Sequence, residues 1–326
     1  MNASNRFRFH SRTRRLLALA GALALLALLA GPAGAWGDKG HGMTARVAVR
    51  SLPDDMPAFF RQAQVELGYL CPEPDRWRVE RREPALRGAV DRDHTVKLEY
   101  VIEPLPRHRY DYVLQYAGKP KPSGGVFTWG EVGFAPYAIA ERSEMLAVNF
   151  MLWRKAAEST DTERRIKRQI EQNIIYIAGL LGHFITDTAQ PLHTSVHVDG
   201  WSADFANPKG YIGKTIHRRF ETDYVNQAIE ERDFEDLVAR QPRSLGPWLE
   251  EALRHIRSSH GHVETVYALD AAHPFGSGSE TAEAKQFTCR RLADGSQALR
   301  DFWYSAWSKS ATLPERNAAR VSERAR

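Results

Sequence analysis

Two segments in the middle of the chain, 135–157 and 163–187, place apolar residues at the spacing of one helix face over several turns. A helix with such a stripe must bury it against another element, and strand-like alternation is confined to one short piece at 95–102. Shorter helical patterns occupy 42–50, 56–67, 217–239, 247–271 and 281–308, and loops rich in Pro and Gly span 105–133 and 199–213. We therefore expect an all-α fold, a single-domain helical bundle with long connecting loops.

The first 35 residues have the three parts of a secretory signal. Five arginines precede an apolar run at 16–30, and the small residues Ala33-Gly34-Ala35 follow it. The run is shorter than the about 20 residues that a membrane-spanning helix needs. We expect cleavage after Ala35, export to the periplasm or out of the cell, and no transmembrane anchor in the processed protein. A mature domain over 36–308 and a charged, disordered tail over 309–326 would remain.

Removal of the first segment would also remove the apparent basicity of the chain. The chain carries 45 Lys and Arg against 40 Asp and Glu, and residues 1–35 hold five arginines and no acid. The processed protein would therefore have 40 basic and 40 acidic side chains. We conclude that its binding partner is not held by a large net positive charge. Cys71 and Cys289 could form one disulfide, which is too few for a disulfide scaffold. We expect the protein to be a monomer.

Histidines and carboxylates recur at a spacing that a helix brings to one face. His183 and Asp187 lie four residues apart, and a proline two residues before His193 ends the helix, so that His193 can turn back toward the same place. His217 and Glu221 repeat the same spacing. Imidazole nitrogens and carboxylate oxygens are the ligands expected of a hydrolytic zinc site. One such pair alone often forms a surface hydrogen bond, but two pairs and a further histidine predict a metal centre.

Trp36 is the residue that cleavage after Ala35 would place at the N-terminus. A free α-amine has a pKa of about 7.7–8.0, so it readily loses its proton near neutral pH and becomes a nitrogen ligand. With His41 close by, it could hold a zinc ion. The alternative is that Trp36 is an ordinary core aromatic that follows the signal.

The opening Trp36-Gly37-x-x-Gly40-His41 and the segment 183–193 together form a specific pattern. In type and spacing they resemble the secreted trinuclear-zinc nucleases typified by the fungal single-strand-specific enzymes, relatives of the bacterial zinc-dependent phospholipases C. The resemblance runs in pieces from Trp36 to Glu221. It implies a hydrolase whose helical bundle and long loops surround a trinuclear zinc cleft, with the C-terminal helices completing the bundle.

The resemblance also implies a set of ligands for three Zn²⁺ ions. Trp36, through its amine and carbonyl oxygen, and His41 would hold the first ion, and Asp75, His94 and His183 the second, with Asp187 bridging the two. His193, His217 and Glu221 would hold the third. Asp75 is preferred to Asp91 or Asp93 because the family's aspartate is followed three residues later by a basic residue that contacts phosphate, here Arg78.

A paired zinc site suits phosphoester hydrolysis because it lowers the pKa of bound water to about 7 and so supplies a nucleophile. Asp187 would join the two ions at the point of attack, and the third ion would stabilise the leaving oxygen. Arg78 would brace a non-bridging phosphate oxygen with its forked guanidinium. The resemblance implies an endonuclease that cleaves single-stranded DNA or RNA to 5′-phosphate products, with 3′-nucleotides as a further candidate substrate.

The alternative is a phospholipase C that cleaves the headgroup phosphodiester of a phospholipid. Two departures from the nuclease pattern bear on this choice. Glu221 stands where the fungal nucleases have aspartate, and glutamate there is the habit of the phospholipases. Thr95 follows His94 where an aromatic residue that helps to stack a base is expected. A third possibility, purely structural zinc, would need closed sites with four protein ligands, and the third set here has three.

Overall fold

The computed structural model describes residues 36–78, 84–278 and 281–314. The expected signal, residues 1–35, and residues 315–326 of the expected tail lie outside this part of the chain. Regular structure in the described ranges is helical, and the nearest approach to a sheet is one isolated bridge between Pro120 and Val126. The predicted all-α class is therefore confirmed. Among the described helices, none is long and apolar enough to cross a membrane.

Thirteen α-helices, five 3₁₀-helical turns and one π-helical turn follow one another along the described chain. The α-helices are α2 (Gly37–Arg50), α3 (Ala58–Arg61), α4 (Gln64–Leu70), α5 (Glu73–Arg76), α6 (Pro84–Val90), α7 (Arg109–Tyr116), α8 (Ala135–Lys155), α9 (Asp161–Ala189), α10 (Ile216–Arg218), α11 (Val225–Ala228), α12 (Trp248–His260), α13 (Val263–Ala272) and α14 (Ala282–Ser310). The turns are η1 (Asp91–Asp93), η2 (Leu98–Tyr100), η3 (Pro191–Thr194), η4 (Arg219–Tyr224), η5 (Glu231–Asp233) and η6 (Glu235–Leu237).

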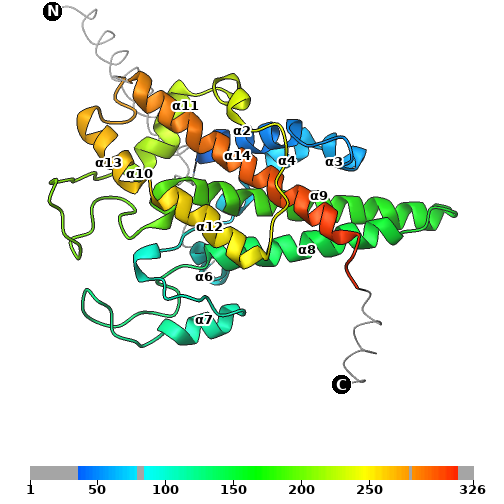
Figure 1. Cartoon of the computed structure of the whole chain (residues 1–326), viewed down its shortest axis with the longest axis horizontal. Coiled ribbons are helices and arrows are strands. Elements are labelled where there is room, and N and C mark those ends of the chain that lie inside the picture. Colours follow the sequence, from blue (N-terminus) through cyan, green and yellow to red (C-terminus); the bar gives the residue numbers. More distant parts are fainter. Residues whose placement is uncertain (1–35, 79–83, 279–280, 315–326) are drawn as a thin grey trace, which may run out of the picture. The chain divides into compact units, whose positions relative to one another are not determined.

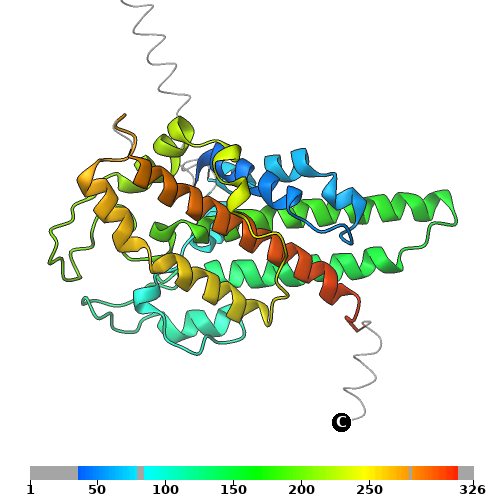
Figure 2. The same ribbon diagram turned by 45° about the horizontal axis from the view of Figure 1, so that its top comes forward.

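The frame of the bundle is the hairpin of α8 and α9, which lie side by side in both ribbon views (Figures 1 and 2). Thr160 begins α9 with a capping box, in which its hydroxyl accepts a hydrogen bond from the Glu163 amide and the Glu163 carboxylate accepts one from the Thr160 amide. α14 and α12 pack against this hairpin, and α2 and α4 pack against α9. Residues 181–189 of α9 are all buried, so this end of the helix lies inside the bundle.

The largest apolar cluster fills the space between α8, α9 and α14. Phe60 packs against Phe150 with ring centroids 5.7 Å apart and against Trp303 at 5.3 Å. The Trp303 indole donates a hydrogen bond of 3.1 Å to the carbonyl oxygen of Ala178, so this buried polar group is satisfied. The cluster holds α9 rigidly on the side that leads to its buried end.

Two glycines let other segments approach α9 closely. A Cβ atom at Gly179 would collide with the Leu70 side chain, and one at Gly182 would lie 3.2 Å from the Cys71 sulfur. Larger residues at these positions would push α4 and the chain that follows it away from α9. The small residues therefore bring Cys71, and Asp75 shortly after it, to the buried end of the helix.

The long helices agree with their sequence patterns, whereas several shorter predictions differ in detail. The predicted segment 247–271 is two helices, because the chain turns at Gly261 and begins α13 at Val263. The segment 56–67 is likewise divided between α3 and α4, and 217–239 is a series of short helical pieces. The predicted loop 105–133 contains α7.

The strand-like piece at 95–102 does not form a strand, and this segment contains η2 instead. Its backbone groups bond to separate segments rather than to one partner strand. The Val96 amide donates to the His193 carbonyl at 2.9 Å, and the Lys97 amide donates to the Val132 carbonyl at 2.7 Å. The segment that follows His94 is therefore a connection that is hydrogen-bonded to two separate segments.

The expected tail begins inside the last helix. α14 continues to Ser310, and the Lys309 ammonium lies 4.0 Å from the centre of the Trp248 ring. Leu313 packs against the main apolar cluster. Residues 309–314 are thus part of the folded body, in contrast to the predicted boundary at 308.

Candidate metal centre

Eight predicted ligand side chains come together around the buried end of α9. His183 and Asp187 project from one face of this helix, as their spacing predicts. His41 comes from α2 and Asp75 from α5, while His94 follows η1. The remaining three side chains come from short helical segments that follow α9: His193 lies in η3, His217 in α10 and Glu221 in η4.

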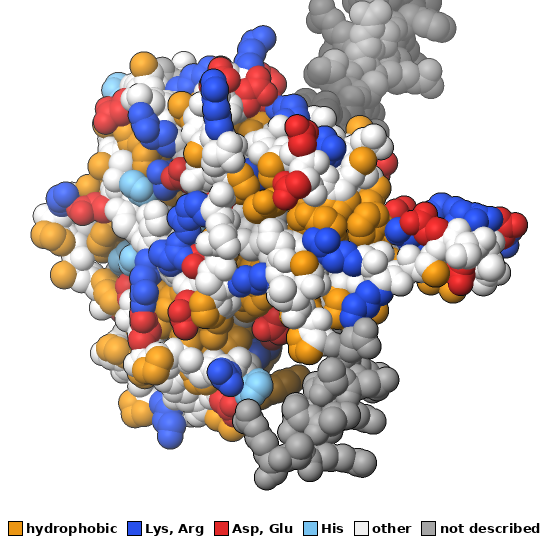
Figure 3. Space-filling view, turned by 45° about the vertical axis from the view of Figure 1, so that its right-hand side comes forward, with side chains coloured by type: hydrophobic (Ala, Val, Ile, Leu, Met, Phe, Trp, Pro, Cys, Tyr) orange, Lys and Arg blue, Asp and Glu red, His pale blue; other side chains and the backbone are white. Residues whose placement is uncertain are grey.

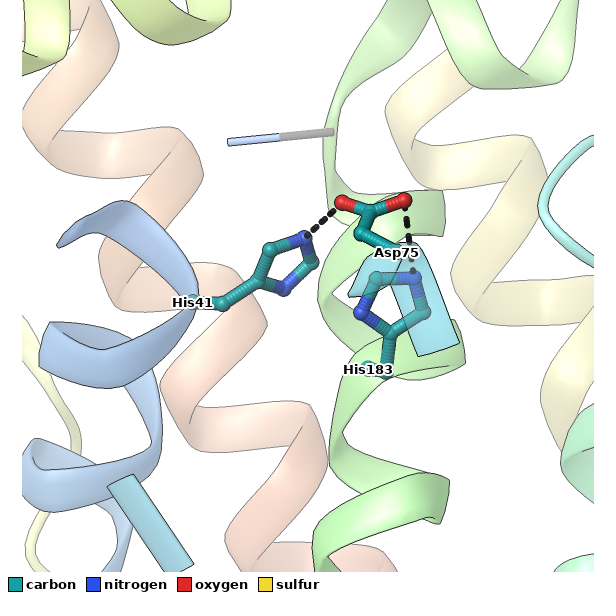
Figure 4. Close-up of side chains that lie close together, drawn as sticks. All are labelled: His41, Asp75 and His183. Carbon is teal, nitrogen blue, oxygen red and sulfur yellow. Dashed lines mark ion pairs between the residues drawn. The ribbon is translucent and has the colours of Figure 1, made fainter. Parts of the chain in front are cut away.

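The first group contains three imidazoles and two carboxylates. The Nδ1 atom of His94 lies 2.9 Å from both the Nε2 atom of His183 and the Oδ2 atom of Asp187. The Nε2 atom of His41 lies 3.3 Å from the Oδ1 atom of Asp187. Asp75 completes the group, with its oxygens directed at both His41 and His183 (Figure 4).

Both carboxylates of this group face two neighbouring positions. Asp187 directs Oδ1 toward His41 and Oδ2 toward His94 and His183. Asp75 does the same at longer range: Oδ2 lies 3.9 Å from His41, whereas Oδ1 lies 3.7 Å from His94 and 3.8 Å from His183. The geometry therefore offers two adjacent cation positions joined by two carboxylates, although only Asp187 was predicted to bridge.

The second group consists of His193, His217 and Glu221. The Nε2 atoms of the two histidines are 3.2 Å apart, and the Oε2 atom of Glu221 lies 3.5 Å from the first and 3.0 Å from the second. The buried amide of Gln190 donates a hydrogen bond of 3.0 Å to the same carboxylate oxygen and fixes its orientation. These three side chains form the predicted third set and could hold one further ion.

Two of the three histidines in the first group, His41 and His183, are held in a tautomer that suits metal binding, whereas His94 directs its Nδ1 atom at the group. The Nδ1 atom of His183 lies 2.9 Å from the Cys71 carbonyl oxygen, which can only accept a hydrogen bond. The Nδ1 atom of His41 lies 2.6 Å from the Thr186 hydroxyl. Since the proton is needed at Nδ1 in both rings, the neutral imidazoles present the lone pair of Nε2 to the group.

The histidines of the second group follow the same arrangement. The Nδ1 atom of His193 faces the His94 carbonyl oxygen at 2.8 Å, and that of His217 faces the Val198 carbonyl oxygen at 3.1 Å. Their Nε2 lone pairs are therefore directed at Glu221 and at each other. A proton on one ring or a bound cation must therefore lie between these groups, and two nitrogens with one carboxylate oxygen suit a metal ion.

Several atoms of the centre are buried without a hydrogen-bond partner in the described part of the chain. They are Nε2 of His41, Nε2 of His94, Oδ1 of Asp187 and Oε1 of Glu221. Buried polar atoms are normally paired, because leaving one unpaired costs about 1–3 kcal/mol. The orphaned atoms of His41 and Asp187 face each other, so a metal ion would satisfy both. The donor set, nitrogen and oxygen from histidine and carboxylate, fits zinc.

The ionisation of the centre without metal shows how strongly its charges interact. Burial lowers the pKa of His183, and the pKa falls to about 4 although Asp187 opposes the shift. Burial also acts on His41, but the contacts with Asp187 and Cys71 outweigh it and raise its pKa well above the usual value. Burial would raise the pKa of Asp187, yet the neighbouring imidazoles hold it well below its usual range.

The same balance holds in the second group. Burial alone would raise the pKa of Glu221, but His217 and His193 lower it to about 2. Burial lowers the pKa of His193, whereas Asp187 and Glu221 raise it, and the net shift is upward. Asp187 and Glu221 are therefore ionised at neutral pH.

Arg78 lies at the edge of the first group. Its guanidinium contacts the Oδ1 atom of Asp75 at 3.3 Å and the Oδ1 atom of Asp91 at 3.4 Å, and its side chain is 29% exposed. Burial would lower its pKa, but Asp75, Asp91 and Asp187 raise it, so the group is permanently charged. Arg78 thus orients Asp75 and still reaches solvent, as a phosphate contact would require.

The structure separates Asp75 from the two aspartates that were weighed against it. Asp93 is enclosed by guanidinium groups and forms ion pairs with Arg109 and Arg142. Asp91 pairs with Arg87 at 2.9 Å and with Arg78. Among these three, Asp75 is the one that lies within 4 Å of the clustered histidines.

Trp36 precedes α2, and its side chain has a clear structural role. The indole is fully buried, donates a hydrogen bond of 2.8 Å to the Thr186 carbonyl and packs against Phe220 at 5.3 Å. Its carbonyl oxygen accepts a hydrogen bond from the Gly40 amide. The core aromatic role that was weighed for Trp36 is therefore present, and the role of its α-amine stays a prediction.

The ligands are oriented by groups that were not predicted from the sequence. They include the Cys71 carbonyl, the Thr186 hydroxyl and the Gln190 amide. Thr186 could have been suspected from the sequence because it directly precedes Asp187. A backbone carbonyl, such as that of Cys71, leaves no signal in the sequence. Cys71 and Cys289 are both buried free thiols. His197 stacks on the Trp201 ring at 3.9 Å and accepts from the Ser202 amide, which is a structural role.

Comparison with known proteins finds likenesses among solved structures, and two of them are alpha toxins of Clostridium. No protein-family model matches the sequence, and no curated protein matches it. The alpha-toxin of Clostridium perfringens from the avian strain SWCP is similar with a TM-score of 0.44 and 15% identity, over 84% of this chain and 65% of the toxin. The alpha toxin of Clostridium absonum gives a TM-score of 0.42 and 11% identity, over 85% of this chain and 67% of the toxin. This chain therefore spans about two thirds of the length of each toxin.

Proposed function

We propose that this protein is a zinc-dependent phosphodiesterase with three ions in one centre. The observation that carries the proposal is the meeting of imidazole nitrogens and ionised carboxylates around α9, with buried atoms left unpartnered in the described chain. His41 with Asp187, and His94 with His183, would hold the adjacent ions, with Asp75 beside both. The Trp36 amine would complete the first position after cleavage.

Zinc in such a centre would supply an activated water and charge stabilisation for phosphoryl oxygens. The chain itself supplies orientation and access. His217 is the most exposed of the eight ligand side chains, at 18%, whereas Asp187 and His183 are fully buried. His217 and Arg78 therefore connect the centre to solvent, and we expect a phosphodiester to approach the ions past these side chains. Arg78 would bind a phosphoryl oxygen through the donors that Asp75 and Asp91 leave free.

The surroundings of the site favour a phospholipid headgroup as the substrate, in preference to the nucleic acid implied first by the sequence. Arg78 and Arg87 both pair with Asp91, so they do not form an unopposed basic groove of the kind that binds a polynucleotide. On the face seen in Figure 3, basic side chains are interspersed with acidic and apolar ones. The second group contains Glu221, which is held by Gln190, and glutamate at this position resembles the phospholipases more than the fungal nucleases.

Single-stranded nucleic acid is the second candidate. The Trp-Gly-x-x-Gly-His opening and the guanidinium of Arg78 beside Asp75 support it. We further propose export after cleavage behind Ala35, a monomer, and a single catalytic domain that begins at Trp36. These proposals rest on the sequence.

The test is hydrolysis of phosphatidylcholine and of single-stranded DNA by the correctly processed protein, with zinc and then with chelator. Release of phosphocholine that the chelator stops, with DNA intact, would support the phospholipase proposal. Cleavage of DNA with lipid intact would replace it with the nuclease. If zinc-loaded protein cleaves neither substrate nor a simple phosphodiester such as bis(4-nitrophenyl) phosphate, the proposed function is wrong.

A further inference from the structure

Thr186 contacts both residues that are expected to hold the first ion. Its hydroxyl lies 2.6 Å from the Nδ1 atom of His41, and its carbonyl oxygen accepts the indole hydrogen bond of Trp36 at 2.8 Å. The next residue is Asp187, whose Oδ1 atom faces His41. Thr186 therefore links the Trp36 indole, the His41 imidazole and the Asp187 carboxylate of the first position. It lies 145 residues after His41 in the chain.

The direction of the hydrogen bonds follows from the hydroxyl's single hydrogen. The Thr186 hydroxyl donates to the carbonyl oxygens of Gly182 and His183 in its own helix, at 2.9 and 3.0 Å. Toward His41 it can therefore only accept, which places the imidazole proton on Nδ1. The Nε2 lone pair is then directed at Asp187, 3.3 Å away, and at Asp75, 3.9 Å away.

The site around Thr186 leaves it little freedom. The residue is fully buried, the Cys71 sulfur lies 3.9 Å from its hydroxyl, and its methyl group lies near Gly295 of α14. These contacts hold the side chain in the rotamer that faces His41. The hydroxyl is thus a fixed acceptor, and it does not depend on a mobile water.

From this geometry we infer that Thr186 is a positioning residue that selects the metal-binding tautomer of His41 and anchors Trp36 beside it. The inference rests on the proposed zinc centre. It predicts that the hydroxyl sets the zinc affinity of the first position alone. The second and third positions have their own orienting groups, the carbonyl oxygens of Cys71, His94 and Val198.

The same helix provides a matched control. Thr188 is also fully buried, and within the described part of the chain its hydroxyl donates only to the Phe184 and Ile185 carbonyl oxygens of α9. Thr186→Val and Thr188→Val therefore each remove one hydroxyl from α9, and the valine side chain has nearly the same shape as the threonine that it replaces. Thr186→Ser retains the hydroxyl, and Thr186→Ala removes it without the branched side chain.

The experiment measures zinc bound per chain during titration of the processed protein with a chelator, with helicity checked by circular dichroism. We expect Thr186→Val and Thr186→Ala to release one ion at about 10–100-fold lower chelator strength, the usual cost of losing such a support. Thr186→Ser and Thr188→Val should release all ions as the unaltered protein does. If the valine variant does not fold, the alanine variant supplies the test.

Two results would overturn the inference. In the first, folded Thr186→Val or Thr186→Ala retains all ions with unchanged affinity. In the second, Thr188→Val weakens one ion as much as Thr186→Val does, which would mark a general effect of the helix. Failure of the zinc centre itself gives a different result, because the unaltered protein would then bind no zinc.

Discussion

Asp187→Asn should empty two metal positions and leave the third occupied. The substitution keeps the size of the side chain and removes its charge. In the structure Asp187 is fully buried and faces both adjacent positions, with Oδ1 3.3 Å from His41 and Oδ2 2.9 Å from His94. The group of His193, His217 and Glu221 has its own carboxylate and should be retained.

The expected magnitude follows from the number of cations that share this carboxylate. A hydrogen bond or contact to a charged group contributes about 1.5–3 kcal/mol. Two cations lose such a contact in the variant, so about 3–6 kcal/mol of binding free energy is lost in total. At about 1.4 kcal/mol per tenfold, zinc binding at the joined pair weakens by roughly 10²–10⁴ overall.

The assay is elemental analysis of zinc after equilibration with a graded series of chelators. The unaltered protein should hold three ions, Asp187→Asn one, and Glu221→Gln two. Circular dichroism establishes that each variant remains helical. Three ions in folded Asp187→Asn, or the loss of all ions in Glu221→Gln, would refute the bridging role and the independence of the two groups.

Three further predictions concern the terminus, the arginine and the core. One extra residue before Trp36 should remove one zinc ion and most of the activity, and a fully active extended form would refute the amine ligand. Arg78→Lys should reduce kcat/KM by roughly tenfold to hundredfold, because lysine lacks the fork that binds Asp75 and phosphate together; unchanged kinetics would exclude the contact. Phe150→Ala should cost about 3–5 kcal/mol in urea unfolding with zinc content unchanged, since Phe150 is a fully buried partner of Phe60; a smaller loss would show that the core collapses around the gap.

The long helices and the ligand pairs could be predicted because both depend on one periodicity. The 3.6-residue repeat identified α8, α9 and α14, and it placed His183 with Asp187 on one face. The short connections could not be predicted in this way. The segment 95–102 alternates like a strand, but its amides bond to η3 and to the loop before α8.

The groups that orient the metal ligands could not be predicted from the sequence, for a different reason. The Cys71 carbonyl that fixes His183 belongs to the backbone and lies 112 residues away in the chain. Every residue has such a carbonyl, so only the fold selects the one that matters. The close approach that places it there depends on Gly182, whose role becomes visible only once α4 and α9 are in contact.

The central claim is tested most directly by zinc-edge anomalous diffraction from crystals of the protein processed after Ala35. We predict three peaks around the buried end of α9: one between His41 and Asp187, one between His94 and His183, and one among His193, His217 and Glu221. No peak at these positions in zinc-loaded crystals, or peaks elsewhere on the molecule, would contradict the proposal.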